Sequence, residues 1–318
     1  THLQLSHAVN PDLLFKNYLY VSGTSQTLRD YFDWFAKLTQ EYFETTPQTV
    51  LDIACNDGSQ LNSFKALGLK TYGVDPAENL HPLSSANHDV VCDYFTDKYA
   101  YHYGSKNLDI ITAQNVFAHN SYPLEFLRQC KEIMHDKSRL FIQTSQADMI
   151  QNNEFDTIYH EHISFFSTSS MQAIAKKHKL FLHRVYTTDI HGTSYVFVIS
   201  KSKLEPKPGV SENLLREKSI GLTDILTYPD YALKCYKTTF DLKKKLTQFK
   251  KEGYLLVGYG AAAKGNTFLN FLKLDNNFID FITDGSKFKI NKYTPLSRIL
   301  IVPDNYLKKI KEKICIIF

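Results

Sequence analysis

The sequence lacks three features that would each place the chain in a particular class of protein. None of its five cysteines forms a CxxC pair, and scattered cysteines of odd number predict reduced core thiols in a cytoplasmic protein. No apolar run approaches the ~18 residues that span a bilayer, so we expect no membrane segment. The net charge of +4, from 37 basic and 33 acidic residues, does not indicate nucleic-acid binding but permits an anionic small molecule.

Apolar, strand-like runs alternate with helical stretches from residue 49 onward. Four such runs each precede a helical stretch: TVLDIAC, LKTYGVD, LDIITAQ and RLFIQTS. This alternation is typical of a parallel sheet covered on both faces. Two closely spaced runs, FLHRVYTTDI and TSYVFVIS, then predict an antiparallel pair. A second strand–glycine–helix unit starts at YLLVGYG, so we predict an α/β fold with a Rossmann-like domain followed by a smaller Rossmann-like domain.

The predicted organisation has four parts. The linker KSKLEPKPG has two prolines and no apolar period, and residues 25–44 show the apolar spacing of an amphipathic helix. The predicted parts are an N-terminal lid and helix at 1–48, a cofactor-binding domain at 49–200, a linker with helices at 201–250, and a substrate-binding domain at 251–318. Because the chain stops within the apolar run ICIIF, we expect further sequence beyond it.

The turn VLDIACNDGSQL joins the first strand to a helix and has the form of a nucleoside-cofactor site. Such a site needs small residues for close backbone approach and a helix N-terminus nearby. Asp52, Ala54, Asn56 and Gly58 occupy the positions of the acidic-x-Gly-x-Gly-x-Gly pattern of S-adenosylmethionine (SAM) sites. A dinucleotide site rarely replaces its first two glycines, because its pyrophosphate sits against them. SAM has no pyrophosphate, so the turn favours SAM over NAD; a tight turn without any ligand is the structural alternative.

Further candidates for the cofactor site lie at the ends of later strands. Asp75 ends the second strand about 20 residues after the turn, where an acidic side chain can hold ribose hydroxyls. Asp93 follows the run DVVCD, from which an adenine amino group can be reached. Asn115 and His119 follow the strand LDIITAQ, at the edge where α/β proteins bind ligands. We predict that Asn115 contacts the cofactor and that His119 contacts the substrate.

The segment FDTIYHEHISFF concentrates groups capable of proton transfer. In an extended strand His160 and His162 would share one face and Tyr159 and Glu161 the other, whereas a turn would break this alternation. Histidine is the natural base near neutral pH, and a tyrosine hydroxyl can donate to an enolate oxygen. Glu161 can fix a histidine tautomer or contact a substrate hydroxyl. A metal site and a hydrogen-bonded core cluster are the alternatives, and we predict no metal because no third ligand of matching spacing is present.

A second glycine turn, VGYGAAAKGNT, has the spacing of a dinucleotide fingerprint. Gly258, Gly260 and Ala263 form a G-x-G-x-x-A pattern, and Asp284 ends the next strand about 20 residues later. This pattern supports a rival function, a nicotinamide-dependent oxidoreductase. Lys264 lies beside a helix N-terminus, where an anion would offset the repulsion between the lysine and the helix dipole.

Several sequence blocks, in this order along nearly the whole chain, resemble the nucleotide-sugar C-methyltransferases that make branched deoxysugars for antibiotics and bacterial polysaccharides. The blocks are NPDLLFKNYLYVSGTS, VLDIACNDGS, ITAQNVFAHN, FDTIYHEHISFFS, IHGTSYVFV and GAAAKGNTFLN. Relatives carry an N-terminal zinc module built on cysteine pairs, which this sequence does not contain. We therefore expect either a fragment that begins just past the module or a protein that lacks it.

The resemblance implies SAM-dependent methylation at C-3 of a nucleoside-diphosphate-linked 4-keto deoxysugar. By resemblance His162 is the base that removes the C-3 proton, Tyr159 and Glu161 lie beside the sugar, and either Tyr18 or Tyr20 completes the pocket. The remaining substrate-binding candidates are His119, His160, His191, Lys264 and Asn266. Two other functions stay open: an NAD(P)-dependent nucleotide-sugar oxidoreductase and a non-catalytic nucleotide-sugar binding protein.

Overall fold

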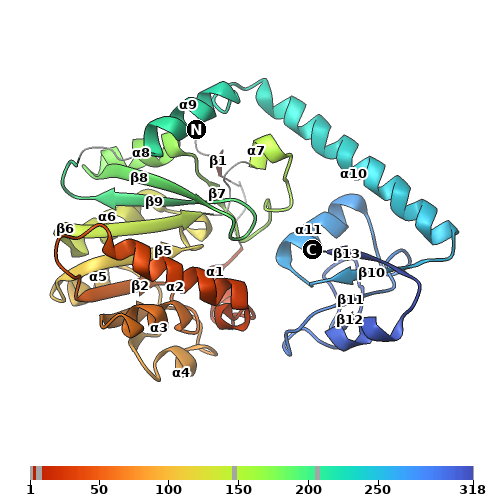
Figure 1. The fold of residues 1–318 in the computed structure, drawn as a ribbon, viewed down its shortest axis with the longest axis horizontal. Helices are drawn as coiled ribbons and strands as arrows, with labels where there is room; N and C mark the ends of the chain where they lie inside the picture. The colour runs from red at the N-terminus through yellow and green to blue at the C-terminus, as the bar shows by residue number, and fades with distance from the viewer. Residues whose placement is uncertain (1–2, 5–8, 145–148, 205–207, 318) are drawn as a thin grey trace. The chain divides into compact units, whose positions relative to one another are not determined.

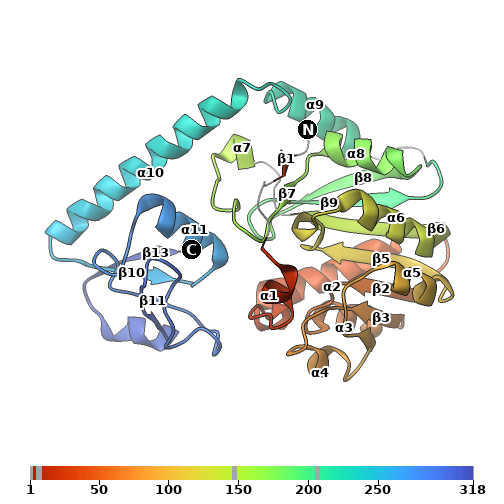
Figure 2. The ribbon, with the colours of Figure 1, turned by 180° about the vertical axis from the view of Figure 1, so that it is seen from behind.

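The computed structural model describes residues 3–4, 9–144, 149–204 and 208–317, which form two compact units (Figures 1 and 2). Unit 1 comprises Thr1–Asp148 and His160–Thr223, and unit 2 comprises Met149–Tyr159 and Asp224–Phe318. The segment Met149–Tyr159 thus interrupts unit 1 in sequence but groups with unit 2. No helix in the described part of the chain has the length and apolar character needed to cross a bilayer.

Unit 1 is built on a seven-stranded sheet with the order β4-β3-β2-β5-β6-β9-β8. The strands are β2 (Thr49–Ile53), β3 (Lys70–Val74), β4 (Asp89–Val91), β5 (Leu108–Gln114), β6 (Met134–Thr144), β8 (Phe181–Thr188) and β9 (Ser194–Ser200). The strands from β4 to β6 are parallel, and β9 and β8 complete the sheet as the predicted antiparallel pair. The strand order reverses between β2 and β5, so the carboxyl ends of these strands form the crevice in which such sheets bind ligands.

Helices cover both faces of this sheet, as predicted. One face carries α2 (Gln26–Gln40) and α3 (Ser59–Ala66), and the other carries α5 (Asp97–Gly104), α6 (Pro123–Ile133) and α8 (Thr168–Lys177) (Figures 1 and 2). Successive strand residues face opposite layers: Ile110 and Phe141 pack with α2, whereas Ile111 and Ile142 pack on the other side. Apolar residues therefore follow one another along these strands instead of alternating with polar residues, because both faces of each strand are buried.

Shorter elements complete unit 1 around the sheet. Helix α2 begins after Ser25, whose hydroxyl accepts the Leu28 N–H at 3.4 Å. A two-stranded ribbon pairs β1 with β7 in antiparallel register. The elements of this group are β1 (Leu3–Gln4), α1 (Pro11–Phe15), η1 (Ser22–Thr24), α4 (His81–Ser84), η2 (Phe117–His119), β7 (Ser164–Phe165) and α9 (Val210–Ser219).

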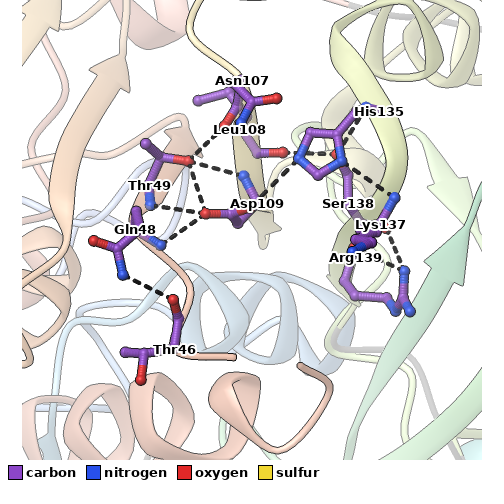
Figure 3. Close-up of polar contacts among 10 residues, drawn as sticks. All are labelled: Thr46, Gln48, Thr49, Asn107, Leu108, Asp109, His135, Lys137, Ser138 and Arg139. Carbon is purple, nitrogen blue, oxygen red and sulfur yellow. Dashed lines mark hydrogen bonds and ion pairs between the residues drawn. The ribbon is translucent and has the colours of Figure 1, made fainter. Parts of the chain in front are cut away.

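A polar network joins the amino-terminal ends of β2, β5 and β6 (Figure 3). The Asp109 carboxylate accepts the Gln48 N–H at 2.7 Å and the Thr49 N–H at 3.2 Å, and its other oxygen lies 3.4 Å from His135 Nε2. The Ser138 hydroxyl donates to Leu108 O at 2.6 Å. This edge lies opposite the carboxyl ends of the strands, so the network fixes the sheet without occupying the ligand-binding crevice.

Unit 2 contains a four-stranded parallel sheet with the order β12-β11-β10-β13. Leu256, Leu269 and Ile282 are fully buried in the core between this sheet and its helices. The region predicted as helical at 211–250 contains two separate helices, α9 in unit 1 and α10 in unit 2. The elements of unit 2 are α7 (Met149–Asn152), α10 (Thr227–Lys251), β10 (Leu255–Tyr259), α11 (Ala263–Leu272), β11 (Phe281–Thr283), β12 (Ile301–Val302), η3 (Asp304–Lys309) and β13 (Lys313–Ile317).

The prediction that the cysteines are core thiols is correct for three of them and wrong for one. Cys55, Cys130 and Cys235 are buried, whereas Cys92 is exposed. Cys92 follows the short edge strand β4, whose residues are only partly covered, and an edge strand gives no second layer to bury it. The side chain of Cys315 lies outside the described residues.

Candidate active site

The turn after β2 adopts the backbone conformation that its glycine pattern implies, although two of its three glycines are replaced. The φ angles of Ala54, Asn56 and Gly58 are 62°, 52° and 81°, all in the left-handed region where only glycine is unstrained. Gly58 also has close neighbours, because an added Cβ would lie 3.1 Å from the Ser84 Cα. The chain therefore holds a glycine-type turn at the switch point of the sheet while paying a conformational cost at Ala54 and Asn56.

Two buried acidic side chains lie beside this turn, and Asp75 bonds to it directly. Asp75 accepts the Asn56 N–H and the Ala77 N–H, each at 2.8 Å, and thereby ties the turn to the end of β3. Asp52 is 3% exposed and accepts the Thr112 hydroxyl at 2.7 Å. Burial raises the pKa of Asp52 to about 7, although the Thr112 hydrogen bond opposes this shift. Burial likewise raises the pKa of Asp75, against the two backbone hydrogen bonds.

An N-terminal strap, residues 16–24, lies against the turn. The Asn56 side chain accepts the Ser22 N–H at 3.0 Å and donates to Tyr20 O at 3.1 Å. Asp57 accepts the Gly23 N–H at 3.0 Å. Asn79 forms a reciprocal pair with the backbone N–H and C=O of Tyr18, both at 2.9 Å. The strap is therefore positioned by the same loops that form the predicted cofactor site.

Four of the predicted residues meet at the end of β5. The Tyr18 hydroxyl donates to Glu161 Oε2 at 3.1 Å, and His119 Nδ1 lies 3.9 Å from the same oxygen. The His119 and His162 rings are 5.0 Å apart in an edge-to-face arrangement, and Phe15 lies 5.7 Å from the His119 ring. Two histidines, a carboxylate and a phenol thus form one cluster, which we call the His–Glu cluster (Tyr18, His119, Glu161 and His162).

The cluster is sheltered from water, and its electrostatics follow from that burial. His162 is 4% exposed, and the side chains of His119 and Glu161 are 11% and 17% exposed. Burial lowers the pKa of His119 well below its ordinary value, and repulsion from His162 and His160 lowers it further. Burial raises the pKa of Glu161, while Tyr18 and His160 act in the opposite direction. Neutral imidazole is therefore the favoured form of His119.

Of the two alternatives that the sequence left open for Tyr159–His162, the structure shows the turn, which breaks the alternation of an extended strand. The Ile163 N–H donates to Glu161 O at 3.1 Å, which reverses the chain just before β7. His162 is consequently buried, whereas the His160 side chain is 54% exposed and lies 3.9 Å from Glu161 Oε1. Tyr159 is half-buried and ends the segment that groups with unit 2. The two histidines therefore have different environments rather than a shared face.

The other candidates in unit 1 lie around the cluster and the turn. The Tyr20 ring is 6.5 Å from both the Tyr18 and the His191 rings. Asp93 accepts the Tyr99 hydroxyl at 2.6 Å, which lowers the pKa of its partly exposed carboxyl. The Tyr18 hydroxyl, rather than that of Tyr20, contacts Glu161, so the structure distinguishes the two tyrosines that the sequence left open.

Buried polar atoms that lack hydrogen-bond partners among the described residues gather at the carboxyl ends of β5 and β6. They are Gln114 Oε1, Asn115 Oδ1, His119 Nε2, Gln143 Nε2 and Thr144 Oγ1. Buried polar groups are nearly always hydrogen-bonded in native proteins, so this set fits a polar ligand. Sequence reasoning named Asn115 and His119 but missed Gln143 and Thr144. Their position at the end of the run RLFIQTS was the signal that could have found them.

In the second glycine turn, as in the first, an aspartate carboxylate accepts a backbone N–H of the turn. Gly260 has a φ of 90°, and Asp284 accepts the Ala261 N–H at 2.8 Å and lies 3.2 Å from Lys289 Nζ. Lys264 and Asn266 lie in the first turn of α11, and Asn266 Oδ1 is buried without a partner among the described residues. The Asp284 carboxylate also accepts the Ser286 N–H at 2.7 Å, so it bonds to two backbone N–H groups, as Asp75 does.

Metal ligands are not gathered in the described part of the chain. No group of three or more His, Cys, Asp or Glu side chains there has the arrangement that could hold a metal ion.

The doubly wound sheet, with a glycine-type turn and buried acidic residues at its switch point, defines an α/β enzyme that binds a nucleoside cofactor. The chain belongs to the C-methyltransferase family of methyltransferases. The family described as "Methyltransferase domain" matches residues 24–182, half of the chain, and that described as "C-methyltransferase C-terminal domain" matches residues 189–318. The predictions of a SAM-dependent methyltransferase and of SAM as its cofactor are therefore confirmed.

Individual relatives were found by sequence and by structure. The C-methyltransferase NovU of Streptomyces niveus is 29% identical over 323 residues, which cover 96% of this chain and 76% of NovU. The plantazolicin methyltransferase BpumL bound to SAH matches with a TM-score of 0.44 and 17% identity, over 54% of this chain and 82% of BpumL. A SAM-dependent methyltransferase from Archaeoglobus fulgidus matches with a TM-score of 0.46 and 16% identity, over 54% of this chain and 94% of that protein.

Proposed function

We propose that this enzyme methylates C-3 of a 4-keto deoxysugar carried on a nucleoside diphosphate, and that His162 is the base. The observation that carries the proposal is the His–Glu cluster, which lies at the carboxyl end of β5. The strap contributes Tyr18 to this cluster and also contacts the turn after β2. Carbon methylation requires a base next to the methyl donor, because the C–H bond must lose its proton before the carbon can attack the methyl group.

The residues around the turn fit SAM. Asp75 retains acceptor capacity for ribose hydroxyls beyond its two backbone hydrogen bonds. Asn115 and its neighbours Gln114 and Gln143 offer buried, unsatisfied polar atoms for the amino-acid end of the cofactor, and Asp93 is the candidate for the adenine. When bound, SAM supplies an electrophilic methyl group on a sulfonium ion.

The cluster can perform the proton transfer that precedes methylation. A C–H bond beside a ketone is acidic enough for a histidine base if the enolate oxygen is stabilised, and a tyrosine hydroxyl can supply that stabilisation. When His162 takes the proton, the new positive charge forms beside the neutral imidazole of His119, whose Nδ1 lies 3.9 Å from Glu161 Oε2. Tyr18 holds the Glu161 carboxylate through its hydrogen bond. We therefore propose His162 as the base, with His119 beside it and with Glu161 and Tyr18 completing the cluster through His119.

We propose that the second glycine turn, taken within unit 2, binds a diphosphate group. Lys264 carries positive charge in the first turn of α11, where helix dipole and lysine both favour an anion. The buried Asn266 Oδ1 supplies a further polar contact. His191 and His160 are the remaining candidates for contacts to the sugar.

The test is a comparison of matched variants with a nucleoside-diphosphate 4-keto deoxysugar as substrate. We expect His162→Asn to lower kcat by about 10²–10⁴-fold, the usual contribution of general-base catalysis. Tyr18→Phe is expected to lower kcat more than Tyr20→Phe, because only Tyr18 contacts Glu161. SAM affinity, measured by calorimetry, should stay unchanged in His162→Asn and so exclude misfolding as the cause.

A second readout isolates the proton transfer. In D₂O with S-adenosylhomocysteine in place of SAM, the wild-type enzyme should exchange the C-3 proton of the substrate for deuterium, and His162→Asn should not. Exchange that persists in His162→Asn would contradict the assignment of the base. Full methyl transfer by that variant would contradict the proposed mechanism as a whole.

A further inference from the structure

A hollow of about 390 Å³ lies on unit 1, away from the active site. Its lining residues lie on the last turns of α6 and α8, just beyond α8, and just after β9. Because α6 returns to the start of β6, the hollow lies toward the amino-terminal edge of the parallel strands, opposite the His–Glu cluster. Its lining consists of Arg128, Lys131, Glu132, Lys177, His178, Lys179 and Lys201.

The positive charge of this basic hollow is only partly neutralised by the protein. Arg128 is paired with Asp97, Glu125 and Glu132. Lys201 Nζ donates to Met134 O at 2.8 Å.

The other three lysines lack such partners. Lys131, Lys177 and Lys179 form no ion pair with an acidic side chain within the described residues. Lys131 and Lys177 lie in the last turns of α6 and α8, where the helix dipole favours a cation. Lys179 lies beyond the end of α8, so this explanation does not extend to it.

Two unfavourable features coincide at the edge of the hollow. His178 Nε2 is buried and has no hydrogen-bond partner among the described residues, a state that usually indicates a bound water or ion. Lys179 has a φ of 54°, at the position after a helix where glycine is the usual residue. A lysine there costs conformational free energy that glycine would not, and it places a further cation beside the hollow.

We propose that the basic hollow binds a phosphate group at a site separate from methyl transfer. Lysine is a common phosphate ligand because its ammonium acts as a point charge with three donors. The volume lies within the range of small-molecule sites, and His178 Nε2 can complete its hydrogen bonding with a phosphate oxygen. The phosphate can belong to free inorganic phosphate or to a nucleotide, which share this chemistry.

The test is calorimetric titration of inorganic phosphate and of UDP at low salt into the wild-type enzyme, Lys177→Ala and a control, Lys176→Ala. Lys176 is adjacent on α8, is also exposed, and does not line the hollow. We expect saturable phosphate binding that Lys177→Ala weakens at least five-fold and Lys176→Ala weakens less than two-fold. If UDP shows a component that is tighter than phosphate and is lost in Lys177→Ala, the source is a nucleotide; equal affinities indicate free phosphate.

Lys179→Gly separates binding from folding. Removing the left-handed lysine should raise Tm by about 2–4 °C in phosphate-free buffer, whereas the increase in Tm that phosphate causes in the wild-type enzyme should disappear. The proposal is overturned if phosphate shows no saturable binding, if Lys176→Ala weakens it as much as Lys177→Ala, or if Lys179→Gly keeps the full phosphate response.

Discussion

At the scale of single residues, the turn after β2 combines a glycine-type backbone with non-glycine side chains. Ala54 has a φ of 62°, and a left-handed conformation costs an L-residue about 1–2 kcal/mol. Glycine removes this strain but adds freedom to the unfolded chain. Ala54→Gly should therefore raise the free energy of unfolding by about 0.5–1 kcal/mol in urea denaturation.

A matched control makes the same chemical change in a regular helix. Ala173 is exposed within α8, where Ala→Gly costs about 1 kcal/mol. The two variants should therefore shift stability in opposite directions. A destabilised Ala54→Gly protein would show that the methyl group of Ala54 contributes packing that outweighs the backbone strain.

Asp52 gives a pH dependence of stability with a defined sign. Its pKa is about 7 in the folded protein against the ordinary value of 3.8. Between these pH values the folded state keeps a proton that the unfolded state releases, so the stability of the wild-type protein falls as pH rises toward 7. Asp52→Asn carries no such proton, and its stability relative to wild type should increase across this window by up to about 4 kcal/mol. Urea denaturation of both proteins from about pH 4 to about pH 8 spans this window, and a constant difference between them would contradict the prediction.

The ends of strands gave Asp52 and Asp75 as candidates, but the same signal at the end of β6 was overlooked for Gln143 and Thr144. Asp52 and Asp75 follow from the strand–turn–helix spacing alone. The sequence could not predict that His160 is exposed and His162 buried. The same four residues, Tyr159–His162, are compatible with a strand and with a turn. The choice of Tyr18 over Tyr20 depends on the Asn79 contacts with the strap, which join residues 61 apart. Local pattern carries no information on such a contact.

At the scale of elements, the strap is held on the cofactor turn by a few hydrogen bonds and one close approach. A Cβ at Gly23 would overlap the Ser59 hydroxyl and lie 2.5 Å from Asp57 Oδ2. Gly23→Ala must therefore displace either the Ser59 and Asp57 side chains, of which Asp57 holds the strap, or the strap itself. We expect SAM affinity, measured by calorimetry, to fall at least ten-fold, an effect of about 1.4 kcal/mol.

Gly104→Ala provides the control for this prediction. Gly104 ends α5 and has nothing within 4 Å of an added Cβ, so its replacement should leave SAM affinity unchanged. Unchanged affinity in Gly23→Ala as well would mean that the strap does not contribute to the cofactor site.

The central strands of unit 1 were predictable because they are apolar on both faces, and α2 was predictable because it is amphipathic. The antiparallel closing pair follows from two closely spaced runs, FLHRVYTTDI and TSYVFVIS. The break between α9 and α10 did not follow, since residues 220–226 contain no proline and only one glycine. The grouping of Met149–Tyr159 with unit 2 rests on tertiary contacts, such as that between Phe155 and Phe271 with ring centroids 4.4 Å apart.

At the scale of the whole molecule, the residues that stabilise the large sheet and the residues predicted to take part in catalysis lie at opposite edges of that sheet. The Asp109 network fixes the amino-terminal edge (Figure 3), and the predicted cofactor and proton-transfer residues occupy the carboxyl edge. Asp109→Ala leaves the backbone N–H groups of Gln48 and Thr49 without their acceptor. It should lower the free energy of unfolding by about 2–3 kcal/mol and leave SAM affinity within two-fold of wild type. A parallel loss of affinity would contradict the separation of the two edges.

The central claim is that the methyl group is transferred to a carbon atom beside the ketone of a nucleotide-linked sugar. The most direct measurement is a reaction with SAM labelled with ¹³C at the methyl group and a nucleoside-diphosphate 4-keto deoxysugar, followed by ¹³C–¹H correlation NMR of the product. The account predicts a labelled methyl group bonded to C-3, together with loss of the C-3 proton signal. A labelled methyl group on a hydroxyl oxygen, or no transfer to any 4-keto sugar by an enzyme that binds SAM, would contradict it.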